Sequence, residues 1–252
     1  MLINRLHLYW HRFINYVAYF FRFNFRGDKE FVKEVCTEMN NKEQSYEAFG
    51  SLNKEYTHFL KINDSVCIKD FGAGSSVLSG EERKIKAIAR TSLKSKSEYQ
   101  KIFRLLKALN PTKIMELGTS LGLGTAYLSM ASQKTSDIVT IEGCPDIARF
   151  AQRYWAKKLN NVTFVEGNID EVLEKELQAL QEVDVFLFDA NHRYEPTIRY
   201  FHTCLPYIHK NAVFILDDIY WSPEMTKAWK ELQNHPKTIA SYDGYHMGIL
   251  WV

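Results

Sequence analysis

One segment near the middle of the chain, residues 113–129, limits most strongly what the whole chain can fold into. It reads KIMELGTSLGLGTAYLS: a short apolar run, three glycines, and then residues that favour a helix. The apolar run is typical of a buried parallel strand. Gly118, Gly122 and Gly124 lack a Cβ, so the backbone there can turn tightly and approach a ligand. Strand, glycine loop and helix in this order predict an α/β fold that holds a nucleotide-like ligand at the carboxyl end of its sheet.

The sequence after this segment predicts the rest of a parallel sheet. Strand-like runs alternate with helical segments, an order that implies right-handed crossovers. The runs are DIVTIEG, VTFVEG, VDVFLFDA and AVFILDD. The final KTIASYDGYHMGILWV predicts two strands joined by a turn at Asp243-Gly244, with one antiparallel strand at the edge of the sheet. A glycine-rich turn without any ligand is the alternative interpretation of the first loop, because its GxxxGxG spacing does not fit GxGxxG.

Polar residues that follow two of these strands are candidate ligand contacts. Glu142 ends the second strand, about 20 residues beyond the glycine loop, where a carboxylate can accept hydrogen bonds from a ribose diol. A solvated glutamate at a strand end is the alternative. Asn168 and Ile169 follow the third strand, where they can pair with the edge of an adenine and cover its face. An ordinary loop explains them almost as well.

Carboxylates also end the next two strands. Asp189 ends the fourth strand, and Asp217 and Asp218 end the fifth. Because parallel strands bring their carboxyl ends to one edge of a sheet, these oxygens are predicted to gather beside the glycine loop. They would suit Mg²⁺ or another divalent cation. The alternative is that one carboxylate binds the ammonium group of a ligand and the others cap helices.

Taken together, residues 113–252 resemble a class I S-adenosylmethionine-dependent methyltransferase, within the catechol O-methyltransferase-like group of small-molecule methyltransferases. The resemblance depends on five motifs in order: ELGTSLGLG, TIEG, VEGNID, FDANHRYE and LDDIYWS. It implies a Rossmann-like, seven-stranded, mostly parallel sheet with an antiparallel last strand. It also implies S-adenosylmethionine as cofactor and O-methylation of a small-molecule acceptor.

The resemblance assigns roles to individual residues. The residues that match the family's cofactor site are Glu116, Gly118, Ser120 and Gly122 at the methionine end, Glu142 at the ribose, Asn168 and Ile169 at the adenine, and Asp189 near the methionine amine. The tentative metal ligands are Asp189, Asp217 and Asp218. Metal-dependent members have Asp-Asn where this chain has Asp217-Asp218, which changes the charge of the site and puts the metal in doubt.

The predicted catalytic residues are His192 and Asp189. Metal-dependent members of the family place a lysine base three residues after the first aspartate, and this chain has His192 at that position. An imidazole can gain and lose a proton near neutral pH, so His192 is the candidate base that removes the proton of the acceptor. The alternative is a surface or core histidine beside the start of a helix.

The chain is predicted to have two parts, a helical N-terminal extension over residues 1–110 and the methyltransferase domain over residues 111–252. A second glycine-rich stretch, residues 70–76, lies in the extension. It is predicted to be a turn and not a cofactor loop, because a charged segment and an amphipathic helix follow it instead of a helix and a strand. A role in closing over the ligand is the alternative.

Residues 1–25 are predicted to form an aromatic-rich helix. Arginines and histidines interrupt its apolar residues, so no span of about 20 apolar residues could cross a membrane. Its apolar side chains recur at helical spacing: Leu2, Leu6, Tyr9, Phe13, Val17 and Phe20. This stripe is predicted to pack on the catalytic domain or on a second copy in a homodimer. Peripheral contact with a membrane surface is the less favoured alternative.

Bulk properties exclude other classes of function. A net charge of +2 and the absence of an Asn-Pro-Pro run after the fourth strand argue against a nucleic-acid methyltransferase. Four scattered cysteines without metal-ligand spacing favour a cytoplasmic protein. Two alternatives stay open from the residues: an NAD-type oxidoreductase, and a non-catalytic nucleotide-binding module on the same fold.

Overall fold

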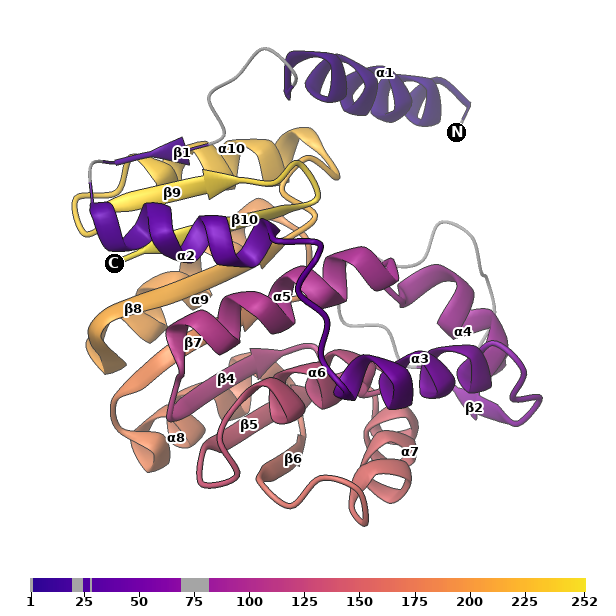
Figure 1. Cartoon of the computed structure of the whole chain (residues 1–252). Coiled ribbons are helices and arrows are strands. Elements are labelled where there is room, and N and C mark those ends of the chain that lie inside the picture. The colour runs from indigo at the N-terminus through magenta and orange to yellow at the C-terminus, as the bar shows by residue number, and fades with distance from the viewer. Residues whose placement is uncertain (1, 20–24, 28, 69–81) are drawn as a thin grey trace.

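A mixed sheet forms the centre of the computed structural model, which describes residues 2–19, 25–27, 29–68 and 82–252 (Figure 1). The strands of this sheet are β1 (Phe25–Arg26), β4 (Lys113–Leu117), β5 (Asp137–Glu142), β6 (Val162–Glu166), β7 (Val183–Phe188), β8 (Ile208–Asp217), β9 (Ala240–Asp243) and β10 (Met247–Trp251). They lie in the order β1-β9-β10-β8-β7-β4-β5-β6. Strands β6, β5, β4, β7 and β8 are parallel to their neighbours, and β10 pairs antiparallel with both β8 and β9.

The predicted seven-stranded, mostly parallel sheet with an antiparallel last strand is confirmed, and two details differ. The antiparallel strand β10 is not at the edge of the sheet but between β8 and β9. Its five residues are all buried, which suits an interior strand with a neighbour on each side. An eighth strand that the sequence analysis did not predict, β1, pairs antiparallel with β9.

Helices cover both faces of the sheet. One face packs against α2 (Glu30–Asn40), α3 (Ala48–Phe59), α4 (Ile85–Ser92), α5 (Lys96–Leu109), α6 (Leu123–Ala131) and α7 (Pro145–Trp155). The other face packs against α8 (Ile169–Leu180), α9 (Tyr194–Cys204) and α10 (Pro223–Gln233), with a 3₁₀ turn at Leu205–Tyr207. Because side chains alternate along a strand, Ile114 of β4 lies in the first core and Met115 in the second.

The N-terminal extension shares its apolar core with the sheet. Residues of α2 to α5, from Val32 to Leu106, belong to the same cluster of buried side chains as Ile114 of β4 and Ile215 of β8. The buried guanidinium of Arg104 on α5 donates to the carbonyl of Gln44, at 3.1 Å, and so ties α5 to the connection between α2 and α3. Removal of these helices would therefore expose one face of the sheet.

A short hairpin joins α3 to α4. Strands β2 (Ser65–Cys67) and β3 (Glu82–Lys84) pair antiparallel, with Val66 opposite Arg83. The predicted turn at residues 70–76 falls within the connection between these strands and lies outside the described residues.

Helix α1 (Leu2–Tyr19) contacts the rest of the molecule through a face that the sequence analysis did not predict. Arg12 donates to the carbonyl of Trp221 at 2.9 Å and its guanidinium stacks on the Trp221 ring. His11 lies 2.9 Å from the hydroxyl of Thr226, and Tyr245 donates to the carbonyl of Arg12 at 3.0 Å. The polar face of α1 therefore packs on the body of the chain, where it contacts α10 and the neighbouring loops.

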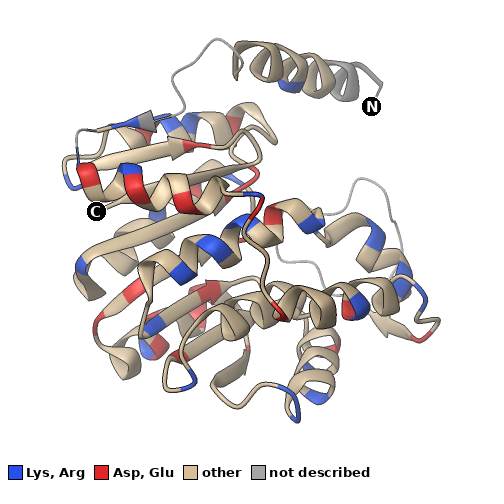
Figure 2. Cartoon of the chain, viewed as in Figure 1, with Lys and Arg blue, Asp and Glu red and all other residues tan. Residues whose placement is uncertain are grey.

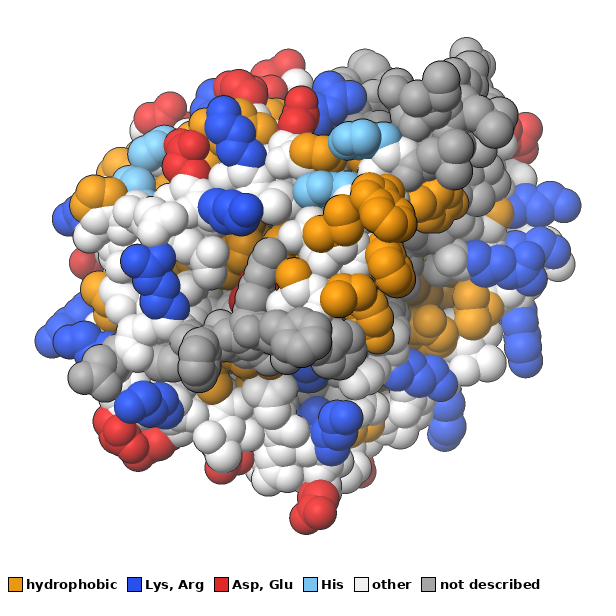
Figure 3. Space-filling view, turned by 90° about the horizontal axis from the view of Figure 1, so that it is seen from above, with side chains coloured by type: hydrophobic (Ala, Val, Ile, Leu, Met, Phe, Trp, Pro, Cys, Tyr) orange, Lys and Arg blue, Asp and Glu red, His pale blue; other side chains and the backbone are white. Residues whose placement is uncertain are grey.

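The aromatic face of α1 points away from the body of the chain, contrary to the prediction that this stripe packs on it. Tyr9, Trp10 and Phe13 are 68%, 64% and 56% exposed. Figure 3, seen from above, shows hydrophobic side chains gathered over this helix. The homodimer and the membrane surface stay predictions for what covers it. Within the described residues, no helix is both long and apolar enough to span a membrane.

Candidate functional site

The glycine loop after β4 approaches the end of β7 so closely that a side chain would not fit. At Gly118, φ is +102° and an added Cβ would lie 2.3 Å from the carbonyl oxygen of Asp189. Gly122, with φ +75°, faces the indole of Trp155, where an added Cβ would lie 2.6 Å from the ring. Both glycines are thus required by contacts within the protein. Gly118 also borders the hollow described below, whereas Gly122 as a cofactor contact stays a prediction.

The Glu142 carboxylate at the end of β5 holds this loop in place. One oxygen accepts a hydrogen bond from the backbone N–H of Ser120, at 2.8 Å, and the other from that of Cys144, at 2.9 Å. Ser120 has φ +48°, an uncommon value for a residue with a Cβ, so the hydrogen bond fixes a strained turn. Glu142 therefore joins the glycine loop to the start of α7.

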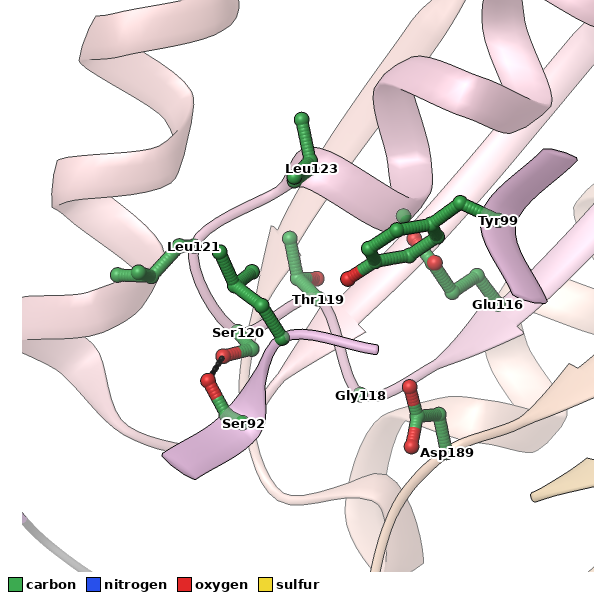
Figure 4. A pocket seen from close by; sticks show the side chains of 11 residues that line it. Ser92, Tyr99, Glu116, Gly118, Thr119, Ser120, Leu121, Leu123 and Asp189 are labelled. Carbon is green, nitrogen blue, oxygen red and sulfur yellow. Dashed lines mark hydrogen bonds between the residues drawn. The ribbon is translucent and has the colours of Figure 1, made fainter. Parts of the chain in front are cut away.

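A small hollow of about 10 Å³ lies between the glycine loop and the connection from α4 to α5. Figure 4 shows Tyr99, Glu116 and Asp189 on one side of it and Ser92 and Ser120, 3.3 Å apart, on the other. Typical small-molecule sites measure about 300–1,000 Å³. This hollow is far smaller, with room for about one water molecule.

Glu116 lies deep in this hollow and is almost completely buried. One of its oxygens accepts hydrogen bonds from the hydroxyls of Thr125, at 2.5 Å, and Thr140, at 2.6 Å. Burial raises the pKa of Glu116 to about 7, although the two hydroxyls act in the opposite direction. The side chain is thus held where its charge can change near neutral pH.

Glu116→Gln is expected to stabilise the protein at high pH. The native state keeps a proton on Glu116 that the unfolded chain loses near its ordinary pKa, so the stability of the wild type falls between about pH 4.5 and 7. Glutamine carries no titratable proton, so this loss is absent in the variant. At pH 8 the free energy of unfolding of the variant should exceed that of the wild type by roughly 2–3 kcal/mol. Urea unfolding without cofactor at pH 5 and pH 8 measures the free energy of unfolding. The control is Glu174→Gln, a substitution at an exposed position. Equal pH dependence in the wild type and Glu116→Gln would contradict the prediction.

Two of the predicted metal ligands meet at the carboxyl edge of the sheet, and the third does not. Among the described residues, Asp189, His192 and Asp217 offer ligand atoms within 4.8 Å of one another. Asp218 is not part of this group. It lies just beyond the end of β8, with φ +53° in the left-handed region, so the backbone turns away from the strand there. His192 Nε2 lies 3.8 Å from Asp189 Oδ1, within reach of an ion pair but too far for a direct hydrogen bond.

Lys94 is the residue of the site that the sequence analysis missed. Its ammonium lies between the two carboxylates, 2.7 Å from Asp189 Oδ2 and in contact with Asp217 Oδ2. The lysine side chain is only 9% exposed. Ser95 and Glu98 form a capping box that starts α5, and this fixes the backbone next to Lys94.

These three charges perturb one another. Burial alone would lower the pKa of Lys94, but Asp189 and Asp217 together hold it well above its ordinary value. Burial would raise the pKa of Asp189, and Lys94 brings it below its ordinary value. Burial and the charge of Asp189 hold the pKa of Asp217 well above its ordinary value despite the lysine. Lys94 thus stays charged at neutral pH and Asp189 is its principal ionised partner.

The two predicted adenine contacts have structural roles of their own. Asn168 caps α8, because its side-chain oxygen accepts from the backbone N–H of Asp170 at 3.2 Å. Ile169 is 7% exposed and packs in the core beneath the sheet. Both residues lie at the end of β6 beside Glu142, and their contact with an adenine stays a prediction.

Sequence comparison finds a methyltransferase domain in this part of the chain. Residues 115–219 match the family model described as methyltransferase domain. The chain is 28% identical over 120 residues to catechol O-methyltransferase B of Danio rerio, an alignment that covers 46% of this chain and 45% of that protein. The match therefore spans about half the length of this relative.

Structural comparison extends the likeness of the fold to most of the chain. An SAH-bound methyltransferase from Podospora anserina has a TM-score of 0.59 at 14% identity, covering 90% of this chain and 97% of the other. A SAM-bound O-methyltransferase from Streptomyces achromogenes, involved in tomaymycin synthesis, has a TM-score of 0.58 at 15% identity, covering 89% and 99%. At these identities the likeness shows the fold.

Proposed function

We propose that this chain transfers the methyl group of S-adenosylmethionine to the oxygen of a small-molecule acceptor. The premise is that residues 115–219 form a class I, catechol O-methyltransferase-like methyltransferase domain. The observation that carries the proposal is the position of Glu142. Its carboxylate lies at the end of β5, bonded to the glycine loop, and the hollow opens beside it.

The cofactor would lie along the carboxyl edge of the sheet. Glu116 and the backbone at Gly118, which line the hollow, would face its methionine end. A carboxylate has about four lone-pair sites, so the two amide hydrogen bonds of Glu142 are compatible with acceptance from a ribose diol. Asn168 and Ile169, at the start of α8 after β6, would face the adenine.

The reaction would be an in-line methyl transfer in which the protein supplies position and charge. S-adenosylmethionine supplies, when bound, an electrophilic methyl group and a thioether leaving group. His192 would take the proton of the acceptor hydroxyl, which makes the oxygen a better nucleophile. Asp189, 3.8 Å from His192 Nε2, stabilises the imidazolium that results. Tyr99 and Glu116 help to exclude water from the hollow.

Thermal unfolding with candidate cofactors tests the proposal. Ligand at about 100 times its dissociation constant adds about 2.7 kcal/mol to the native state, so S-adenosylmethionine and S-adenosylhomocysteine should raise the unfolding midpoint by roughly 5–10 °C. A shift with NAD alone, or with none of the three, would contradict a methyltransferase and favour an oxidoreductase or a binding module.

Glu142→Ala should weaken S-adenosylmethionine binding by about 10- to 100-fold, since hydrogen bonds to a charged group contribute about 1.5–3 kcal/mol each. Isothermal titration measures the affinity. Glu166→Ala is the matched control, because Glu166 lies opposite Glu142 in the register of β5 and β6 and removes the same charge from the same edge. Equal affinities for the two variants would remove Glu142 from the cofactor site.

The charge distribution supports a small-molecule acceptor over a nucleic acid. In the view of Figure 2, Lys and Arg are scattered along the ribbon together with Asp and Glu. The net charge of the chain is +2. Nucleic-acid binding depends on a basic patch that neutralises several phosphates. Incorporation of labelled methyl groups from S-adenosylmethionine into a panel of phenols and catechols is the first search for the acceptor.

A further inference from the structure

The two carboxylates that would hold a divalent cation already hold a cation of the protein's own. Lys94 Nζ lies 2.7 Å from Asp189 Oδ2 and contacts Asp217 Oδ2. The exposed fractions of the Lys94, Asp189 and Asp217 side chains are 9%, 26% and 13%. An ion pair buried to this degree is part of the folded core and is not a passing surface contact.

The backbone on both sides of Lys94 is fixed. Helix α4 ends at Ser92, and the backbone N–H of Leu93 still donates to the carbonyl of Ala89 at 3.2 Å. On the other side, Ser95 accepts from the backbone N–H of Glu98, whose carboxylate accepts from the backbone N–H of Ser95 at 2.9 Å. The C-cap of α4 and the N-cap of α5, one residue away on either side, thus fix the position of Lys94 at the edge of the sheet.

Asp189, His192 and Asp217 would otherwise suit a divalent metal. Two carboxylates and an imidazole are ligands that Mn²⁺ and related ions accept. An ion bound to Asp189 and Asp217, at about 2.0–2.1 Å from their oxygens, would lie close to the Lys94 ammonium that contacts the same two carboxylates, and would repel it. With Lys94 in place, the residues present do not fit a metal.

We propose that the Lys94 ammonium is the built-in cation of this site, and that it excludes a divalent metal from Asp189 and Asp217. The ammonium neutralises charge at the carboxylate pair as a metal would. Its place is held by α4 and α5 of the N-terminal extension, so this part of the chain completes the site. The consequence that methyl transfer needs no metal rests on the proposed function, whereas the occupancy of the site does not.

Mn²⁺ binding to the full chain tests the proposal. The free ion is followed by electron paramagnetic resonance, after treatment with EDTA and without S-adenosylmethionine. Lys94→Met, which keeps the length of the side chain and removes its charge, should bind one Mn²⁺ with a dissociation constant of roughly 0.1–1 mM or tighter. The wild type should bind at least about 10-fold more weakly, because the ammonium repels the ion. Lys96→Ala, an exposed lysine two residues away, should behave as the wild type.

Each outcome decides the proposal. Tight binding of one Mn²⁺ by the wild type, lost in Asp217→Asn, would overturn it by showing that a metal displaces Lys94. A folded Lys94→Met that gains no Mn²⁺ binding would overturn the claim that Lys94 excludes a metal from these carboxylates. The wild-type titration needs no variant, so a misfolded Lys94→Met leaves the test intact. S-adenosylmethionine affinity of the same samples reports the proposed function separately, since a chain can fail either measurement alone.

Discussion

Lys94→Met is expected to lower the free energy of unfolding by about 3–5 kcal/mol, the range found when one partner of a buried ion pair is removed. The variant leaves Asp189 and Asp217 close together without a positive charge between them. Both carboxylates are less than one third exposed, so water cannot replace the lysine fully. Urea unfolding at pH 7, followed by circular dichroism, measures the change.

A second substitution separates charge from packing in this prediction. Asp217→Asn on the Lys94→Met background removes one of the two acidic groups left without the lysine and should recover more than half of the lost stability. Lys96→Ala, on the exposed side of the same segment, should change stability by less than about 0.5 kcal/mol. If Lys94→Met unfolds at the urea concentration of the wild type, the ion pair contributes nothing to the fold, and the lysine is free to leave the site.

The parallel part of the sheet was predictable because each of its strands carries a local signal. The run IMEL before Gly118 is too apolar for a surface strand, and DIVTIEG and VDVFLFDA have the same character. The place of β10 had no such signal. A terminal hairpin can join a sheet by either of its strands, and only the packing of Trp251 and its neighbours in the core puts β10 inside.

The packing face of α1 was predicted wrongly for a related reason. Helical spacing identifies the apolar stripe, and apolar stripes usually face the core. In this chain Arg12 contacts the carbonyl and the indole ring of Trp221, and Tyr9 and Phe13 are exposed to solvent. Which face of a helix packs is decided by partners far away in the sequence, which periodicity cannot show.

Some residues of the candidate site were also predictable from the sequence, and others were not. Asp189 and Asp217 were predictable as neighbours, and Glu142 as a residue of the same edge, because parallel strands bring their carboxyl ends to one edge. Lys94 comes from a connection between two helices, 123 residues before Asp217 in the chain. The motif Ser95-Lys-Ser-Glu98 does predict the start of α5 as a capping box, and so places Lys94 just before a helix. No local pattern shows that this helix end faces the carboxylates.

The lysine also bears on which residue can act as the base. A base must be deprotonated before it acts, and Asp189 and Asp217 hold the pKa of Lys94 well above its ordinary value. His192 Nε2 lies 3.8 Å from Oδ1 of Asp189, and Lys94 contacts Oδ2. The Asp189 carboxylate therefore lies between the permanent cation of Lys94 and the imidazole of His192. In the proposed reaction Lys94 therefore supplies charge and His192 supplies the proton acceptor.

His192→Ala is accordingly expected to lower kcat by about 100- to 10,000-fold, the usual contribution of a general base, with S-adenosylmethionine affinity unchanged. Added imidazole should restore part of the lost rate in the variant, because it supplies the missing proton acceptor. Methyl incorporation into the best acceptor of the catechol and phenol panel measures both, with imidazole added to restore the lost base. His209→Ala is the control, since His209 is half exposed and pairs with Asp184 at the opposite end of β7. Undiminished turnover in His192→Ala would exclude His192 as the base, and because Lys94 remains protonated, it would mean that the acceptor reaches the site already ionised.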